Sequence, residues 1–174
     1  MAGALQDLRV LDLSRILAGP FATQNLADLG ADVVKVEAPW GDDTRKWGPP
    51  FEDINGEQTA AYFQSCNRGK RSISIDFKSV DGLSLLRDLI RNADVLVENM
   101  KVGTLSSLGL NPNELILEHA KLIICQITGF GQTGVRANEP GYDVALQGMS
   151  GIMSVTGESG GSPIKVGVAW IDVL

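Results

Sequence analysis

The sequence predicts an α/β fold in which an open, Rossmann-like parallel sheet carries helices on both faces. Two observations support this prediction: short apolar runs rich in β-branched residues recur along the chain, and segments with helical spacing lie between them. That alternation favours a parallel sheet covered by helices. The predicted strands are Arg9–Leu13, Val33–Val36, Ser72–Ile75, Val95–Val97 and Leu122–Ile127, and the predicted helices are Phe21–Leu29, Val80–Ile90, a short one around Leu105, and Asn113–His119.

Capping signals support the helix boundaries. Pro20 suits the first turn of a helix, and Gly30 suits the end of the same helix. Asn111, Pro112 and Glu114 supply a cap, a proline at the first helical position and a glutamate at the third. The sequence therefore defines where these helices start.

The composition is that of a folded globular protein. The chain has 174 residues, 44% hydrophobic and 21% charged, which is enough for one sizeable core. No run approaches the roughly 18 apolar residues that span a bilayer, and turn-forming residues come too early for a signal peptide, so we expect a cytoplasmic protein without membrane contact. A net charge of −6 without a long basic run argues against nucleic acid as a partner.

The two cysteines predict neither a disulfide framework nor a metal site. Cys66 and Cys125 lie far apart in the sequence and outside any Cys-x-x-Cys pair. We expect both to be buried as small apolar side chains, and we expect no metal.

Two segments follow predicted strands, where open α/β sheets bind ligands. Ser14–Pro20 lies between the first strand and the first helix; it lacks the Gly-x-Gly-x-x-Gly pattern, and a simple turn is the alternative interpretation. Val97–Met100 ends another strand. Glu98 there suits a buried structural role, which leaves Asn99 and the neighbouring backbone as candidates for ligand contact.

Two polar loops carry the remaining cations of interest. Trp40–Pro50 places two indoles around two cations and could stack an adenine and pair a phosphate, or it could be a lid over the core. Asn67–Arg71 is the only tight basic cluster of an acidic chain, and it is either a phosphate site or a solvated approach to the next strand.

Glycine becomes dense from Gly129 onward. In Thr128–Gly134, Gly141–Asp143 and Gly148–Gly151, backbone amides could approach a substrate or an anion closely, or the loops could simply be flexible. The last segment, Lys165–Leu174, begins a new element, so we expect the chain to be part of a longer protein.

Taken in order with Gly167–Asp172, these segments resemble the N-terminal half of the family III CoA-transferases. The resemblance covers essentially the whole chain, and its order and spacing are more specific than any single motif. The most specific pieces are Val10–Leu13 through Ala18–Pro20, Leu29–Glu37, Gly41–Arg45, Asn67–Ser72 and Val97–Asn99.

The resemblance implies that residues 1–174 are the N-terminal part of a CoA-binding large domain, without the smaller domain and the C-terminal return segment. It implies a chain of roughly twice this length that forms an interlocked homodimer. Asp172 matches the catalytic aspartate of the family. The implied CoA contacts are Arg15, Ile16, Leu17, Ala18, Lys70, Arg71, Asn99, Met100, Gly129 and Phe130, and the implied acyl pocket contains Leu17 and Tyr142.

The implied reaction moves CoA from an acyl-CoA to a carboxylic acid through an aspartyl-CoA thioester. The CoA thioester is a substrate, and no permanently bound cofactor is implied. Formyl-CoA transferases have a glutamine where this chain has Leu17, so oxalate and formyl-CoA are not expected as substrates. The isolated chain is expected to be inactive.

Two alternatives stay open. An α-methylacyl-CoA racemase would use a histidine within a Gly-His-Asp motif; the matching segment here is Gly141-Tyr142-Asp143, and the only histidine is His119. A non-catalytic CoA-binding module would bind CoA without forming a covalent adduct.

Overall fold

The computed structural model describes residues 3–54 and 56–174, which form two compact units. Unit 1 ends at Ile127, and unit 2 runs from Thr128 to Leu174. No helix among the described residues is both long enough and apolar enough to cross a bilayer.

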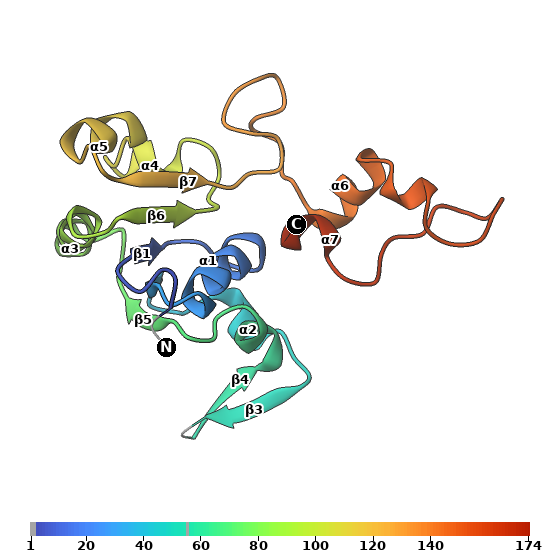
Figure 1. Cartoon of the computed structure of the whole chain (residues 1–174), viewed down its shortest axis with the longest axis horizontal. Coiled ribbons are helices and arrows are strands. Elements are labelled where there is room, and N and C mark those ends of the chain that lie inside the picture. Colours follow the sequence, from blue (N-terminus) through green and yellow to red (C-terminus); the bar gives the residue numbers. More distant parts are fainter. Residues whose placement is uncertain (1–2, 55) are drawn as a thin grey trace. The chain divides into compact units, whose positions relative to one another are not determined.

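Unit 1 is built on a parallel sheet of five strands in the order β5-β2-β1-β6-β7 (Figure 1). Numbered by their place in the chain, the strands of this sheet run 3-2-1-4-5, which is the order of the Rossmann fold. The fold class predicted from the sequence is therefore confirmed. The strands are β1 (Arg9–Asp12), β2 (Asp32–Glu37), β5 (Arg71–Ser74), β6 (Val95–Glu98) and β7 (Ile123–Gln126).

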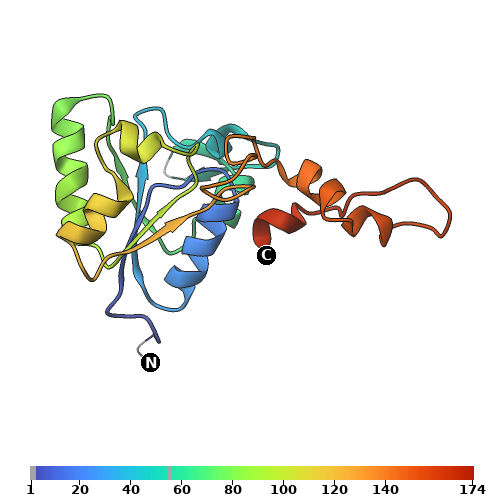
Figure 2. The ribbon, with the colours of Figure 1, turned by 90° about the horizontal axis from the view of Figure 1, so that it is seen from above.

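Helices cover both faces of the sheet (Figure 2). Because successive side chains of a strand point to opposite faces, Val10 and Leu11 of β1 join different cores. On one face, Val10, Val33 and Val97 pack with Leu26 of α1 (Ala18–Asp28). The larger core on the other face includes residues of α3 (Val80–Arg91), α4 (Thr104–Ser107) and α5 (Pro112–Glu118), namely Leu86, Ile90, Leu105 and Leu115.

The predicted helix signals act as expected. The Asn111 side chain accepts a hydrogen bond from the Asn113 backbone, and Pro112 opens α5. Gly30 follows α1 with a φ of 103°, a left-handed conformation that favours glycine.

Several elements of unit 1 were not predicted. They are the 3-10 helix η1 (Asp43–Lys46), the antiparallel hairpin of β3 (Phe51–Ile54) and β4 (Glu57–Ala60), and the helix α2 (Ala61–Ser65). Glu52, Asp53, Glu57 and Gln58 of the hairpin are exposed. Their sequence therefore carries no alternation of apolar and polar residues that would indicate strands.

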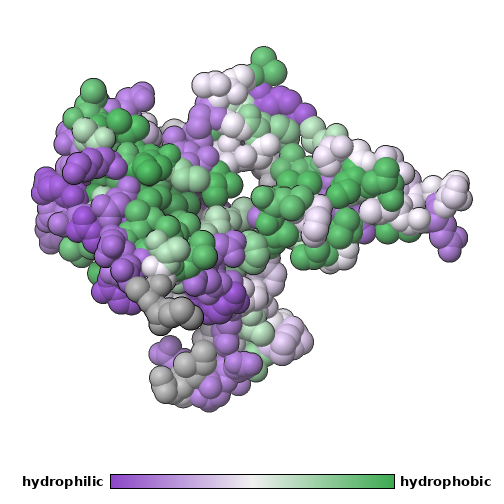
Figure 3. All heavy atoms as spheres, viewed as in Figure 1, coloured by the Kyte–Doolittle hydropathy of each residue, from purple (hydrophilic) through white to green (hydrophobic). Residues whose placement is uncertain are grey.

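Unit 2 contains short helical segments joined by long loops. These are α6 (Asp143–Met149), η2 (Ile152–Ser154) and α7 (Trp170–Val173). Figure 3 shows several of its hydrophobic side chains on the surface. Its exposed apolar residues are Val135, Tyr142, Val144, Met149, Val155, Ile164, Val168, Trp170 and Leu174.

The cysteine prediction is confirmed for one residue and wrong for the other. Cys66 is buried, whereas Cys125 is exposed. Cys125 lies on β7, which is an edge strand, and Ile123, two residues earlier on the same side of the strand, is also exposed (62%). The apolar run predicted the strand, but it could not show that one side of it lies open.

Candidate functional site

The carboxyl ends of β1 and β6 carry the predicted ligand segments, at the point where the strand order of the sheet reverses. Asn99 joins the two ends: its Oδ1 accepts a hydrogen bond from the Arg15 backbone nitrogen at 2.9 Å, and its Nδ2 donates to the Arg15 carbonyl at 2.7 Å. Open α/β sheets bind ligands in the crevice at such a switch point. The loop after β1 and the residue after β6 therefore lie together and form one candidate site.

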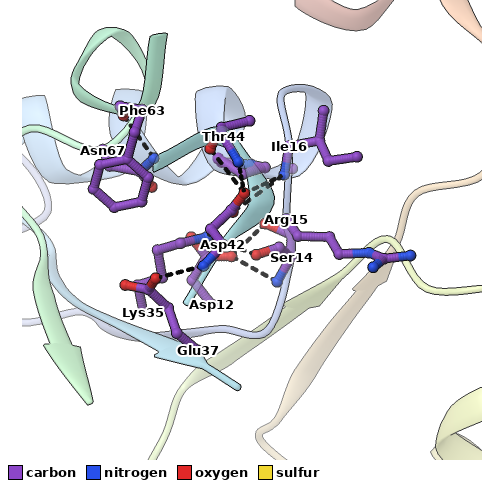
Figure 4. Close-up of polar contacts among 12 residues, drawn as sticks. Asp12, Ser14, Arg15, Ile16, Lys35, Glu37, Asp42, Thr44, Phe63 and Asn67 are labelled. Carbon is purple, nitrogen blue, oxygen red and sulfur yellow. Dashed lines mark hydrogen bonds and ion pairs between the residues drawn. The ribbon is translucent and has the colours of Figure 1, made fainter. Parts of the chain in front are cut away.

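The loop bends at Ile16, the only non-glycine residue with a left-handed φ (69°) among those described. The Asp42 carboxylate accepts a hydrogen bond from the Ile16 backbone nitrogen at 3.2 Å, and it also accepts bonds from the backbone and hydroxyl of Thr44. Figure 4 shows Asp42 between these partners, with the Arg15 side chain directed away from them. A β-branched residue in this conformation costs about 1–3 kcal/mol, so the surrounding contacts must hold it.

Two buried ion pairs lie beneath the loop. Lys35 is 3.0 Å from Asp42, and Lys70 is 3.0 Å from Asp12; all four side chains are at most 2% exposed. Lys35 also donates to the Ser14 carbonyl at 2.7 Å. Asp12 of the second pair accepts a hydrogen bond from the Ser14 backbone nitrogen, so both pairs contact the backbone of the loop.

Glu37, the last residue of β2, extends this network. It accepts hydrogen bonds from Arg45, from Ser72 and from the Asp42 backbone. Burial acts to raise the pKa of Glu37, but these hydrogen bonds and the Arg45 charge outweigh it and lower the pKa to about 2. The carboxylate therefore stays ionised at any physiological pH.

The amino end of α1 opens onto the same site. Leu17 is its N-cap, and no side chain caps the first turn. Gly19 allows the first turn of α1 to pack closely against the loop after β1. A Cβ at residue 19 would lie 2.3 Å from the Ser14 Cβ and 3.6 Å from Asn99, too close to Ser14 for any other residue. Free backbone N–H groups and the helix dipole favour an anionic or carbonyl oxygen at such an end.

The other predicted CoA contacts fall in different places. Ala18 is the first residue of α1, and Met100 follows Asn99 with its nitrogen bonded to Glu98. Lys70 donates to Asp12, to the Pro20 carbonyl and to Asn67, so these acceptors engage all three of its N–H groups. Burial lowers the pKa of Lys70, while Asp12 opposes that change.

The basic cluster is paired with aspartates. Arg68 bonds Asp28, and Arg71 bonds Asp32 at the first residue of β2. Since Asp32 lies at the amino end of its strand, the structure does not bring Arg71 to the loop after β1. CoA contact at Lys70 and Arg71 stays a prediction.

The Trp40–Pro50 loop and the basic cluster meet at a cavity of about 600 Å³. The Arg45 guanidinium lies 3.8 Å from the centre of the Phe63 ring, and Trp47 packs edge-on against Tyr62 with ring centres 5.5 Å apart. Trp40 is exposed. The cavity lining is Arg45, Glu57, Thr59, Phe63, Gln64, Asn67 and Arg68.

In unit 2, Asp172 lies in α7 and is held through its backbone. Asp143 Oδ1 accepts hydrogen bonds from the backbone nitrogens of Ile171 (2.8 Å) and Asp172 (3.4 Å), and Gln147 donates to Asp143 Oδ2. The Asp172 carboxylate itself has no hydrogen bond or ion pair among the described residues. Burial, and to a lesser degree the Asp143 charge, raises the pKa of Asp172.

The glycine-rich segments of unit 2 pack against each other. A Cβ on Gly129 would lie 2.4 Å from the Gly141 Cα, so only glycines allow this backbone contact. Phe130 stacks under Arg136 at 4.1 Å, and Tyr142 is exposed. Near Gly129, the Thr128 hydroxyl and the Gln132 amide nitrogen are buried without a described hydrogen-bond partner.

Several residues of these networks were not candidates in the sequence analysis, among them Lys35, Asp42 and Asp143. Lys35 did give a signal, because a charge inside an apolar strand is seldom buried without a partner. Its partner, however, could not be identified from one sequence. No group of three metal-binding side chains is present among residues 3–54 and 56–174.

Comparison with known proteins places the chain clearly. The sequence profile of CoA-transferase family III matches residues 5–174. A succinate–glutarate CoA-transferase of Agrobacterium fabrum is 55% identical over 98% of the chain, and human succinyl-CoA:glutarate CoA-transferase is 46% identical over 97%. An acetyl-CoA:oxalate CoA-transferase of Acetobacter aceti is 43% identical over 95%.

Solved structures agree with these relatives. A CAIB/BAIF family protein from Brucella suis is 54% identical and superposes with a TM-score of 0.96, covering 99% of this chain and 46% of its own. A protein from Mycobacterium tuberculosis is 34% identical with a TM-score of 0.85, covering 98% of this chain and 47% of its own. The chain spans 43%, 38% and 41% of the length of the three curated relatives above.

Proposed function

Because the chain belongs to CoA-transferase family III, we propose that the protein it forms part of transfers CoA from an acyl-CoA to a carboxylic acid, with Asp172 as the nucleophile. The observation that carries this proposal is the state of the Asp172 carboxylate. It is partly buried, its backbone is fixed by Asp143, and it has no partner among the described residues. A carboxylate left unpaired in this way is available to react.

The proposed reaction proceeds by exchange of thioester and anhydride bonds. The Asp172 carboxylate attacks the thioester carbonyl of the donor, which expels CoA thiolate and forms a mixed anhydride. The thiolate then attacks the Asp172 acyl carbon and releases the donor acid, leaving an aspartyl-CoA thioester. The acceptor carboxylate attacks this thioester, which expels CoA thiolate and forms a second mixed anhydride. The thiolate then attacks the acceptor's acyl carbon, which forms the new acyl-CoA and releases the Asp172 carboxylate.

Unit 1 supplies the proposed CoA site. The uncapped end of α1 and the backbone of Arg15–Ala18, braced by Asn99, offer donors at the switch point of the sheet. The Arg15 side chain is 66% exposed and lies 3.8 Å from the exposed Asp43 carboxylate, a weak ion pair that a phosphate could replace. For Gly129 and Phe130, which belong to unit 2, a role in CoA contact rests on the resemblance alone, and so do the acyl-pocket roles of Leu17 and of Tyr142.

The resemblance alone supports two further parts of the proposal, an interlocked homodimer and the absence of a permanently bound cofactor. The proposed cytoplasmic location rests on the sequence pattern described above instead.

Racemisation at the carbon next to the thioester has less support. Tyr142 occupies the position at which racemases carry the catalytic histidine. His119, the only histidine of the chain, is the C-cap of α5 in unit 1. The proposed reaction therefore includes no acid/base pair that would remove and return a proton at the carbon next to the thioester.

Transferase activity of the full-length protein tests the proposal. Succinyl-CoA is supplied with a panel of carboxylic acids, and new acyl-CoA products are measured for wild type, Asp172→Ala and a control, Asp88→Ala, on the exposed face of α3. We expect Asp172→Ala to lose about 10⁴-fold or more in kcat, as nucleophile variants do, and Asp88→Ala to match wild type. Full activity in Asp172→Ala would refute the proposed nucleophile.

A further inference from the structure

The buried pair of Lys35 and Asp42 does more than a nonpolar pair could do in its place. Lys35 lies in the middle of β2, and its side chain is 2% exposed. Burying two charges is costly, and nonpolar residues of similar volume often stabilise a core equally well. What a nonpolar pair lacks is directional hydrogen bonding. Here those bonds go to the loop after β1: Lys35 to the Ser14 carbonyl, and Asp42 to the Ile16 nitrogen.

The loop needs such contacts because Ile16 is strained. Its φ of 69° is a region that β-branched residues avoid, yet no glycine occupies this position. Every backbone polar group of residues 15 and 16 has a partner elsewhere in unit 1. Asn99 binds both groups of Arg15, Asp42 accepts from the Ile16 nitrogen, and the Cys66 thiol lies 3.5 Å from the Ile16 carbonyl.

Asp42 is itself held from the end of β2. Its backbone nitrogen donates to Glu37 Oε2 at 2.9 Å, and Arg45 binds the same carboxylate. Its Oδ1 accepts hydrogen bonds from Thr44 and lies 3.4 Å from the Ile16 nitrogen. Its Oδ2 lies closer to that nitrogen, at 3.2 Å, and is 3.0 Å from the Lys35 ammonium. The end of β2 is thus connected to the strained Ile16 through two carboxylates, first that of Glu37 and then that of Asp42.

From this geometry we propose that Lys35 and Asp42 are positioning residues of the transfer reaction: together they hold Ile16 in its left-handed conformation and so fix Arg15–Ala18 for contact with the CoA thioester. This inference rests on the proposed function, because it assigns the loop to CoA. Neither side chain is required to touch the substrate.

A double-mutant cycle between Asp42 and Ile16 in the full-length protein tests this inference. Asp42→Asn keeps the size and the Thr44 bonds, but it replaces Oδ2 with an NH₂ group that faces two other donors. Ile16→Gly removes the strain, because glycine adopts this φ without cost. We expect Asp42→Asn to lower kcat/KM for the acyl-CoA by about 10- to 100-fold when residue 16 is isoleucine, the size typical of a misplaced contact.

With glycine at position 16, the same Asp42→Asn change should cost less than about threefold, because the loop no longer needs to be forced into shape. Equal losses in the two backgrounds would overturn the inference, since a purely structural Asp42 would be indifferent to Ile16. If Asp42→Asn does not fold, the double variant Lys35→Met/Asp42→Asn takes its place in the cycle. This double variant leaves no buried ammonium without a partner.

The control is Asp94→Asn, at the amino end of β6. Asp94 accepts a hydrogen bond from the Arg9 backbone at 2.9 Å, so the same chemical change is made far from the loop. Its kcat/KM should equal that of wild type; a loss like that of Asp42→Asn would overturn the assignment to Asp42.

Measuring the Kd for CoA across the same cycle separates this inference from the proposed function. A wild-type protein that binds CoA without transferring it would refute only the proposed transferase function. The inference would then be tested by whether Asp42→Asn weakens CoA binding more with isoleucine than with glycine at position 16. A wild type that does neither would refute both.

Discussion

The two units hold their candidate residues in different ways. In unit 1 the loop after β1 rests on buried charges, Lys35 with Asp42 and Lys70 with Asp12, whose side chains are at most 2% exposed. In unit 2, Gln147 is the only buried residue of 128–174, and Asp172 is placed by a single carboxylate, Asp143. A substitution that displaces the proposed CoA loop should therefore also destabilise unit 1. A substitution that displaces the proposed nucleophile needs to break only a few local hydrogen bonds.

The largest effect on stability should come from breaking a buried pair of unit 1. Lys70→Met leaves the Asp12 carboxylate buried without its cation, which we expect to cost about 3–5 kcal/mol in the free energy of unfolding. Arg71→Met is the matched control: its pair with Asp32 is exposed, so we expect a cost of about 0–1 kcal/mol. Urea unfolding of the full-length protein measures both, and similar losses would contradict the contrast.

Acid should weaken unit 1 through Glu37. Its pKa in the folded protein is about 2, below the ordinary value of 4.5, so its stabilisation is fully present above the ordinary value and is lost as the pH falls towards 2. The amount at stake is about 3 kcal/mol. We expect Glu37→Gln to be less stable than wild type near neutral pH and this deficit to shrink at about pH 3. A deficit that does not change with pH would show that the carboxylate charge is not involved.

In unit 2 the corresponding substitution should affect catalysis instead of stability. Asp143→Ala removes the acceptor for the Ile171 and Asp172 nitrogens, and we expect kcat to fall about 100-fold, as for a misplaced nucleophile. The unfolding midpoint should change little. Asp143→Asn keeps an oxygen for these bonds and should retain most of kcat.

Asp143→Asn should also shift the pH dependence of kcat. The Asp143 charge contributes to the raised pKa of Asp172, so its removal should lower that pKa. Since the nucleophile must be ionised, activity is lost as the pH falls through this pKa, and the acidic limb of the profile should move to lower pH. An unchanged limb would argue against Asp172 as the titrating group.

The smallest effect concerns the choice of acceptor. Leu17 is nearly buried and offers no side-chain hydrogen bond where formyl-CoA transferases have a glutamine. We expect oxalate to be among the poorest acceptors in a panel of carboxylic acids, and Leu17→Gln to improve it by about tenfold, the value of one hydrogen bond. Efficient transfer to oxalate by wild type would contradict this expectation.

The sequence predicts the parts of the molecule whose structure is local. All five strands of the main sheet lie within one or two residues of the runs that predicted them. The signal is strongest for the central strands β1, β2 and β6, which are mostly buried and therefore rich in apolar residues. The β3–β4 hairpin was missed, since its exposed residues carry no such pattern. The pairing of Lys35 with Asp42 was missed for a different reason: only the fold reveals which side chains meet.

The site was predicted unevenly for the same reason. Arg15 and Asn99 were each chosen for their position after a strand, and the structure brings them together because the carboxyl ends of parallel strands share one edge. The basic cluster was predicted from charge alone, and the aspartates that pair with it lie far away in the sequence. Asp172 has no local signal, and only the ordered resemblance identified it.

The most direct test of the central claim is to look for the covalent intermediate. The full-length protein is incubated with succinyl-CoA, quenched in acid and analysed by peptide mass spectrometry. The proposed mechanism predicts CoA or an acyl group attached to Asp172, and no such adduct in Asp172→Ala. An active wild type without an adduct, or with one on another residue, would contradict the assignment of Asp172 as the nucleophile.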